Sequence, residues 1–371
     1  MDKSFNIALL RGDGIGPEVV NEAVKVLDAI SKRYSIDFNY RDALMGASAI
    51  DATGEALPEE TLAICLESDA ILLGAIGDPR FDNNPDSPVR PEQGLLALRK
   101  KLGLFCNVRP IKVYDSLKQL SPLKEHIVSG VDFVIFRELT GGIYFGDKEK
   151  SENFASDLCK YYDYEIERIC REAFKAAKHR RKKVCLVDKA NVLESSRLWR
   201  KVFQRLSKEY PEIETDFMFV DNAAMQLILR PSQFDVIVTS NMFGDILSDA
   251  GSVLSGSLGL LPSSSVGTEG SLYEPVHGSY PQAAGLNIAN PMATILSVEM
   301  MLRDLKLFTE AEAISTSISE CLKHKILTQE LNSENAYSCS DIGDFIANQI
   351  NYGTSTALNI INKTLKESSV N

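Results

Sequence analysis

Phe5-Asn-Ile-Ala-Leu-Leu-Arg-Gly-Asp-Gly-Ile-Gly-Pro-Glu18 is the first of several places where a short apolar run leads into a helical pattern. Phe5–Leu10 is typical of a buried strand, and the glycine-rich turn after it opens an amphipathic helix over Pro17–Lys32. The turn resembles a phosphate-cradling loop, although it matches neither the G-x-G-x-x-G nor the P-loop pattern. A tight turn that needs glycine dihedrals explains it as well.

The same alternation continues along most of the chain. Further strands are expected at Asp69–Leu73, Phe133–Phe136, Val184–Val187, Phe217–Val220 and Asp235–Thr239, and helices at about 92–102, 191–209, 222–230 and 243–255. This pattern predicts an α/β architecture with a largely parallel sheet, and the absence of a dinucleotide fingerprint argues against an ordinary Rossmann fold. From Pro291 a helical pattern dominates. Gly251–Gly270 is rich in Gly and Ser but contains leucines, so we interpret it as an ordered loop or hinge.

Length and charge restrict the class of protein. At 371 residues the chain has room for two domains or one large α/β unit. Its 40 Lys and Arg against 51 Asp and Glu give a net charge of −11, which argues against nucleic-acid binding or attachment to anionic lipid. Seven cysteines without a C-x-x-C pair, and no signal or membrane-spanning pattern, predict a soluble cytoplasmic protein with reduced thiols.

Polar residues follow four of the expected strands. Arg137, Lys189 and Asp221 come directly after apolar runs, and Asp245 begins the helix after Asp235–Thr239. Ligands of α/β sheets bind beyond the carboxyl ends of the strands, so these positions are expected at a functional edge. For any one of them, the simpler explanation is that polar residues resume where a strand ends.

Asp245 and Asp249 have the i, i+4 spacing that places two carboxylates on one face of a helix. Like charges there are unfavourable unless they are neutralised, and oxygen ligands suit Mg²⁺ or Mn²⁺. Asp221 is a possible third ligand. A solvated surface pair remains the alternative on spacing alone.

Arg99, Arg109 and Arg137 would suit a substrate with two carboxylates if they converge, because each guanidinium can bind a carboxylate with two hydrogen bonds. Three ordinary surface arginines are the alternative. Tyr144 and Lys189 are candidates for proton transfer. The loop around His277 could present backbone N–H groups to phosphates, although a lone histidine is more often structural.

Six segments occur in one order along the chain: RGDGIGPE, LRKKLGLFCNVRP, FRELTGGIYFG, DKANVL, SNMFGDILSD and EPVHGS…IANP. Together they resemble the β-decarboxylating dehydrogenases of the isocitrate/isopropylmalate dehydrogenase family, from about residue 5 to residue 350. The resemblance implies two α/β domains that share a long mixed sheet. Residues 1–103 and 257–371 would form the cofactor-side domain, and residues 104–256 the domain that carries substrate, metal and the dimer interface.

The resemblance also implies roles for these residues. The three arginines would bind the two carboxylates of a malate, and Asp245, Asp249 and the Asp221 of a second subunit would bind Mg²⁺ or Mn²⁺. Lys189, which would also reach the site from the second subunit of a homodimer, would help to remove the hydroxyl proton while hydride passes to NAD⁺. Tyr144 would protonate the carbon that loses CO₂. A catalytically silent subunit of the same family is less consistent with a chain that retains all these residues.

Cofactor contacts are implied for Ile15, Glu92, His277, Gly278, Ser279, Gln282, Ala284 and Asn290. Gln282 departs from the aspartate usual in NAD-linked members, which predicts a preference for NAD⁺ with weaker discrimination against NADP⁺. Leu95 and Leu96 stand one helical turn before Arg99, and Val192 stands one turn after Lys189. These apolar residues favour 3-isopropylmalate over isocitrate, whose third carboxylate would be left buried without a partner. Plain helix core is the alternative for both leucines. Tartrate, malate or homoisocitrate remain alternative substrates.

Overall fold

The computed structural model describes residues 3–82 and 87–368. The chain divides into two compact units, Met1–Leu102 with Ser257–Ser264 and Glu269–Asn371 (unit 1), and Gly103–Gly256 with Ser265–Thr268 (unit 2). The strands of the large mixed sheet run in the order β2-β1-β3-β12-β11-β4-β5-β10-β8-β9, which confirms the predicted mixed α/β fold. The assignment of cofactor and substrate functions to the two units stays a prediction.

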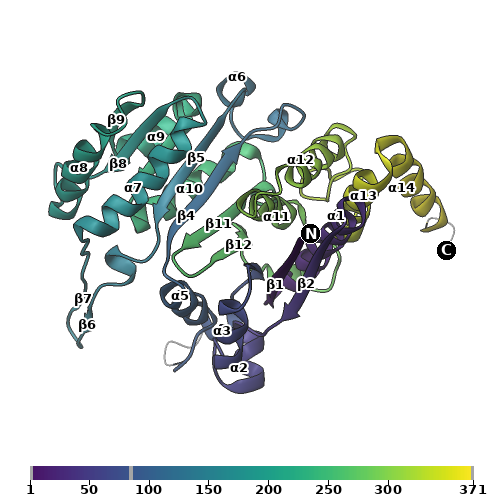
Figure 1. Cartoon of the computed structure of the whole chain (residues 1–371), viewed down its shortest axis with the longest axis horizontal. Coiled ribbons are helices and arrows are strands. Elements are labelled where there is room, and N and C mark those ends of the chain that lie inside the picture. Colours follow the sequence, from purple (N-terminus) through teal and green to yellow (C-terminus); the bar gives the residue numbers. More distant parts are fainter. Residues whose placement is uncertain (1–2, 83–86, 369–371) are drawn as a thin grey trace. The chain divides into compact units, whose positions relative to one another are not determined.

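Unit 1 is built around four strands that pair in parallel: β1 (Lys3–Gly12), β2 (Ile36–Asp42), β3 (Ala70–Ala75) and β12 (Ser271–Pro275). β3 is buried along its whole length, as expected of a strand covered on both faces. The helices of this unit are α1 (Gly16–Tyr34), α2 (Ala47–Thr53), α3 (Glu59–Leu66), α4 (Pro79–Asp82), α5 (Pro91–Lys101), α11 (Met292–Asp304), α12 (Phe308–Lys323), α13 (Cys339–Tyr352) and α14 (Thr354–Ser368). The predicted helical region after Pro291 is therefore confirmed (Figure 1).

Unit 2 carries β4 (Leu104–Lys112), β5 (Asp132–Glu138), β8 (Lys183–Asp188), β9 (Glu214–Phe219) and β10 (Val236–Thr239). β4 pairs antiparallel to β5, and the remaining pairs are parallel. The helices are α6 (Glu125–Val128), α7 (Asp163–Lys178), α8 (Glu194–Ser207), α9 (Val220–Leu229) and α10 (Asn241–Ser252), and a hairpin joins β6 (Lys148–Lys150) to β7 (Ala155–Asp157).

Side chains along the central strands of unit 2 point alternately to the two faces of the sheet, so the core forms two layers. Val134 and Phe136 of β5 belong to the cluster formed with α7 and α8. On the opposite face, Phe133 lies against α10, where a Cβ on Gly251 would be 3.6 Å from the Phe133 ring. Because successive side chains point to opposite faces, Arg137 shares the α10 face with Phe133.

Two expectations about local structure need correction. The predicted strand Phe217–Val220 is confirmed as β9, but this strand begins at Glu214 and ends at Phe219, so that Val220 and Asp221 already belong to α9. The segment Gly251–Gly270 is not only loop, because it contains β11 (Pro262–Gly267). Ser263, Ser264 and Ser265 are buried there, and a strand of small polar residues carries no apolar alternation that the sequence could reveal.

Candidate functional site

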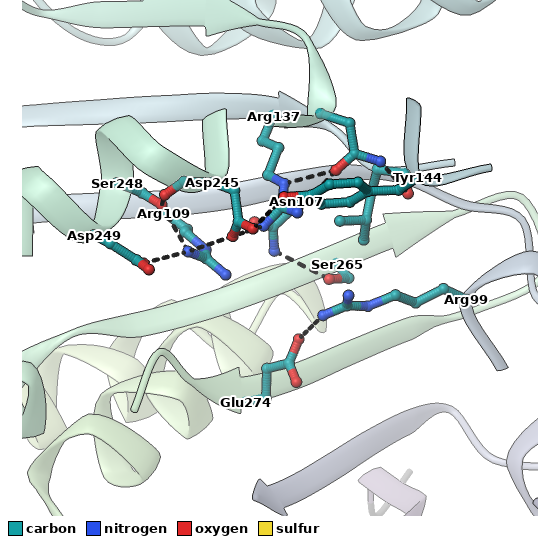
Figure 2. Close-up of polar contacts among 12 residues, drawn as sticks. Arg99, Asn107, Arg109, Arg137, Tyr144, Asp245, Ser248, Asp249, Ser265 and Glu274 are labelled. Carbon is teal, nitrogen blue, oxygen red and sulfur yellow. Dashed lines mark hydrogen bonds and ion pairs between the residues drawn. The ribbon is translucent and has the colours of Figure 1, made fainter. Parts of the chain in front are cut away.

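Arg109 and Arg137 reach the face of α10 that carries Asp245 and Asp249 (Figure 2). Arg137 Nη1 lies 2.5 Å from Asp245 Oδ1, and Arg109 Nη1 lies 3.2 Å from Asp249 Oδ1. The antiparallel register explains why both arginines face the same way: Arg109 pairs with Ile135, two residues before Arg137, so the arginines are diagonal neighbours on one face. Two positive and two negative side chains therefore form a neutral cluster.

A close approach of α10 to β5 makes this cluster possible. A Cβ on Gly244 would lie 2.7 Å from Arg137 Cβ, which is too short for any other residue type without displacement of the arginine. Ser248, one turn after Asp245, accepts a hydrogen bond of 2.6 Å from Arg109 Nη1. Reasoning from the sequence missed Ser248, although its i, i+3 spacing from Asp245 places it on the same helix face.

Partial desolvation raises the pKa of Asp249, although its side chain is 64% exposed, and the neighbouring Asp245 charge adds to the effect while Arg109 opposes it. Both arginine side chains are nearly buried, and Arg109 Nε has no hydrogen-bond partner among the described residues. Arg109 Nε thus lacks an acceptor, and the Asp249 carboxylate is not fully stabilised by its neighbours. A bound ligand would satisfy both groups. An anion would suit the guanidinium, and a divalent cation would suit the carboxylates.

Tyr144 ends the short 3₁₀ helix η2 (Gly142–Tyr144) and donates a hydrogen bond of 3.0 Å to Asp245 Oδ2. The Arg137 guanidinium lies 5.8 Å from the centre of the Tyr144 ring. Desolvation and the charge of Asp245 raise the pKa of the phenol, so Tyr144 stays protonated near neutrality. The residue is therefore suited to donate a proton rather than to accept one.

Lys189 and Asp221 form a separate pair in unit 2, with 2.7 Å between Lys189 Nζ and Asp221 Oδ1. The hydrogen bond from Lys189 lowers the pKa of Asp221. Within the described part of the chain, no three His, Cys, Asp or Glu side chains gather in the manner of a metal site. Within one chain, Asp245 and Asp249 therefore form one group of side chains, and Asp221 and Lys189 form a different one. Val192, 62% exposed, follows Lys189 by three residues.

Arg99 belongs to unit 1, where its Nη2 lies 2.8 Å from Glu274 Oε1. Its convergence with Arg109 and Arg137 stays a prediction. Leu95 and Leu96 are half-buried on α5, in contrast to Leu98 of the same helix, which is fully buried. Glu274 lies in the EPVHGS segment, and no local sequence pattern predicts that its carboxylate pairs with Arg99.

A cavity of about 530 Å³ lies in unit 1 and falls within the usual range for ligand pockets. Four of the predicted cofactor residues line it, together with seven that the sequence did not indicate. The former are Ile15, His277, Gly278 and Asn290, and the latter are Leu258, Gly259, Tyr280, Ile288, Ala289, Gln329 and Glu330. Among these described residues Glu330 is the one with a permanent charge. It accepts hydrogen bonds from Asn290 and Ser257, and no local motif marks it.

His277 offers this cavity a hydrogen-bond acceptor. Its Nδ1 lies 2.9 Å from the Gly278 carbonyl oxygen, and because a carbonyl can only accept, Nδ1 carries the proton. Burial lowers the pKa of His277, which keeps the ring neutral and leaves Nε2 as a buried acceptor without a partner among the described residues. A hydroxyl or amino group satisfies that nitrogen better than a phosphate does.

The other predicted cofactor residues lie around the glycine-rich loop or on the surface. A Cβ on Gly77 would be 3.1 Å from Glu92 Oε1 and 3.6 Å from Ser279 Oγ, so these two side chains flank Gly77. The Ser279 carbonyl accepts a hydrogen bond from the Ile15 amide. Gln282 and Ala284 are exposed and are not part of the cavity lining.

Close backbone contacts explain the glycines after β1. Gly14 has a φ of +58°, and a Cβ there would lie 1.9 Å from the Ser279 carbonyl oxygen. Asp13, between Gly12 and Gly14, accepts hydrogen bonds from the backbone amides of Ala47, Ser48 and Gly77. The loop is thus a tight turn that holds several segments together. Its glycines are explained by the backbone conformation that this turn requires.

The molecule is therefore an α/β protein with a pocket of about 530 Å³ in one unit and an arginine–aspartate cluster in the other. The model of the isocitrate/isopropylmalate dehydrogenase family matches residues 6–346. A 3-isopropylmalate dehydrogenase of Geobacillus kaustophilus is 56% identical over 88% of this chain and 90% of its own length, and one of Bacteroides fragilis is 50% identical over 93% and 99%. The crystal structure of an isocitrate dehydrogenase from Methylococcus capsulatus matches with a TM-score of 0.84 at 33% identity, covering 94% of this chain and 99% of that one.

The chain belongs to the isocitrate/isopropylmalate dehydrogenase family, and the resemblance seen in the sequence is confirmed. None of its described helices has the length and apolar character needed to cross a membrane.

Proposed function

We propose that this chain catalyses the NAD⁺-dependent oxidative decarboxylation of (2R,3S)-3-isopropylmalate to 4-methyl-2-oxopentanoate and CO₂, a step of leucine biosynthesis in the cytoplasm. Relatives that bear the name of this activity are 50–56% identical over about nine tenths of the chain. The observation that carries the proposal is the cluster in which Arg109 and Arg137 face Asp245 and Asp249, with the Tyr144 hydroxyl on the same carboxylate as Arg137.

The cavity of unit 1 would hold the adenosine part of NAD⁺. Its apolar lining suits an adenine ring, and the bare Nε2 of His277 suits a hydroxyl or amino donor. The carboxylate of Glu330 would repel the 2′-phosphate of NADP⁺, and no Lys or Arg is among the lining residues that the structure describes. Glu330 therefore supplies the negative charge that Gln282 lacks.

Asp245 and Asp249 would hold Mg²⁺ or Mn²⁺ together with the Asp221 of a second subunit. Their hard oxygen donors fit such a cation, and the exposed Asp249 carboxylate is accessible to it. In the structure, Arg109 and Arg137 neutralise these carboxylates. A dianionic substrate would take over the arginines while a dication takes over the aspartates, so the net charge of the cluster stays at zero.

In the reaction Arg109, Arg137 and Arg99 would bind the two substrate carboxylates and fix the orientation of C2 and C3. Lys189 would help to remove the C2 hydroxyl proton, and Tyr144, kept protonated by burial and by Asp245, would donate a proton to C3 after CO₂ has left. When bound, NAD⁺ and the divalent cation would supply, respectively, hydride acceptance from C2 and withdrawal of electron density from the C2 oxygen. The half-exposed Leu95 and Leu96, with Val192, would contact the isopropyl group.

The proposed sites would be shared between the two subunits of a homodimer. Within one chain Lys189 pairs with Asp221, whereas Tyr144 pairs with Asp245, and the helix that carries Asp221 exposes a row of apolar residues. Met225, Ile228 and Leu229 of α9 are more than half exposed, as is Ile246 of the adjoining α10. A second copy of this chain would cover such a surface. Light scattering on the purified protein tests this, with a monomer as the contrary result.

A substrate and cofactor panel tests the proposed function. Formation of NADH from NAD⁺, or of NADPH from NADP⁺, is measured with 3-isopropylmalate, malate, tartrate, isocitrate and homoisocitrate, each with and without Mn²⁺. We expect turnover that depends on Mn²⁺ and prefers 3-isopropylmalate with NAD⁺. Faster turnover of an unbranched malate would contradict the substrate assignment, and faster turnover with NADP⁺ would contradict the cofactor assignment.

A further inference from the structure

Asn241 is a buried amide whose hydrogen-bonding capacity is fully used by two separate parts of the site. Its Oδ1 accepts hydrogen bonds from Arg137 Nε at 3.0 Å and from Arg137 Nη2 at 2.8 Å. Its Nδ2 donates to the carbonyl oxygens of Leu139 and Gly141, both at 3.1 Å. Only an amide side chain combines acceptor sites for a guanidinium with two donors for carbonyls.

The backbone turn that Asn241 binds leads directly to the proton-transfer candidate. Leu139 and Gly141 precede Tyr144 by five and three residues. The same turn is tied by the buried Glu138 carboxylate, which accepts a hydrogen bond of 2.7 Å from the Gly141 amide. Gly142 has a φ of +74°, and a Cβ there would lie 2.2 Å from the Tyr161 hydroxyl oxygen. The turn is thus a fixed support for Tyr144.

Two paths lead from Asn241 to one carboxylate. Through Arg137 the first path reaches Asp245 Oδ1, and through the turn and Tyr144 the second path reaches Asp245 Oδ2. Asp245 itself stands one helical turn after Asn241 on α10. The amide therefore closes a ring that links the guanidinium, the phenol and the carboxylate.

We propose that Asn241 is a positioning residue that keeps Arg137 and the Tyr144 hydroxyl in a fixed relation, so that the substrate bound by the arginine is presented to the proton donor. This role rests on the proposed function, because it presumes that Tyr144 donates the proton. Asn241 does not reach the reacting atoms. It acts through Arg137, which binds the substrate, and through Tyr144, which donates the proton.

The two sides of the amide can be separated by substitution. Asn241→Asp keeps oxygen acceptors for Arg137 but turns a carboxylate oxygen toward the carbonyls of Leu139 and Gly141. We expect kcat with 3-isopropylmalate to fall about 30-fold while KM for that substrate changes less than about threefold. Asn241→Ala removes both sides, so we expect the same loss in kcat together with a rise in KM of about tenfold.

Thr61→Val is the matched control. Thr61 is buried on α3, and its hydroxyl donates a hydrogen bond of 2.7 Å to the Leu44 carbonyl. The variant loses a buried hydrogen bond in unit 1, whereas Arg137 and Tyr144 belong to unit 2. We expect a lower melting temperature with kcat and KM within about twofold of the wild type.

A double-mutant cycle with Tyr144→Phe decides between positioning and general damage. If Asn241 acts through Tyr144, Asn241→Ala lowers kcat less than about twofold further in the Tyr144→Phe background. Equal fold-losses in both backgrounds would overturn the proposal, and so would an unchanged kcat in Asn241→Ala. The cycle uses the alanine variant, so it remains decisive even where the aspartate variant does not fold. The proposed function fails separately, if the wild type does not oxidise 3-isopropylmalate or if Tyr144→Phe retains full kcat.

Discussion

The arginine–aspartate cluster of unit 2 and the cavity of unit 1 differ in how far their polar groups are satisfied. In the cluster, Arg109 and Arg137 already have carboxylate partners, although Arg109 Nε has none among the described residues. In the cavity, His277 Nε2 is buried without a partner among the described residues. A ligand of the cluster must therefore exchange existing ion pairs, whereas a ligand of the cavity only adds a bond. We expect changes in the cluster to affect the reaction strongly and changes in the cavity to affect it moderately.

The largest effect is expected for Asp245→Asn. The substitution removes a charge that a divalent cation needs and weakens the partner of both Arg137 and Tyr144. Loss of several kcal/mol of charge stabilisation corresponds to about 10³-fold in kcat/KM. NADH formation over a Mn²⁺ titration measures it, with the exposed Glu212→Gln as a control. A loss below tenfold would show that the cluster is not where the cation acts.

The variants Arg137→Lys and Arg99→Lys test whether arginines from both units bind one substrate molecule. Lysine keeps the charge but cannot form two parallel hydrogen bonds, which costs about 10–100-fold in KM for 3-isopropylmalate. We expect each variant to show this rise with the KM for NAD⁺ within about twofold. Steady-state kinetics with each substrate varied in turn gives both values. A normal substrate KM in Arg99→Lys would restrict carboxylate binding to unit 2.

Glu330→Gln tests the electrostatic character of the cavity. Removing the one permanent charge among its described lining residues is expected to raise kcat/KM for NADP⁺ about tenfold relative to NAD⁺, because a phosphate would no longer face a carboxylate. Glu320→Gln, on α12, is the control. An unchanged ratio of the two kcat/KM values would show that Glu330 does not discriminate between the two cofactors.

The smallest effect concerns the pH dependence of stability at His277. Its folded-state pKa is lowered below the ordinary value of 6.5, so the unfolded state binds more protons as the pH falls below 6.5. Stability is therefore complete above about pH 6.5 and is lost toward the folded-state pKa. We expect His277→Gln to narrow the difference in melting temperature between pH 8 and pH 5.5 by about 2 °C. The exposed His179→Gln is the control for the loss of a histidine, and an unchanged difference in His277→Gln would contradict a neutral ring.

Local patterns predicted much of the fold and several members of the site. The apolar run before Arg137, the helix after Pro291 and the spacing of Asp245 and Asp249 were all readable, because strand and helix periodicities act over a few residues. β4 was missed because Asn107, Arg109 and Pro110 interrupt its apolar pattern. It forms a strand through its antiparallel register with β5, which no local pattern encodes.

The amino-acid sequence by itself determined which groups are available: two carboxylates on one helix face, glycines where the backbone must pass close to itself, and the ordered motifs of a family. The tertiary structure alone decided which of these groups meet. Asn241 binds Arg137 across 104 residues, and Arg109 binds Asp249 across 140. Such pairs depend on strand order, on strand register and on how closely a helix approaches the sheet. These are set by the packing of the whole unit, whereas helix spacing is set by backbone geometry over a single turn.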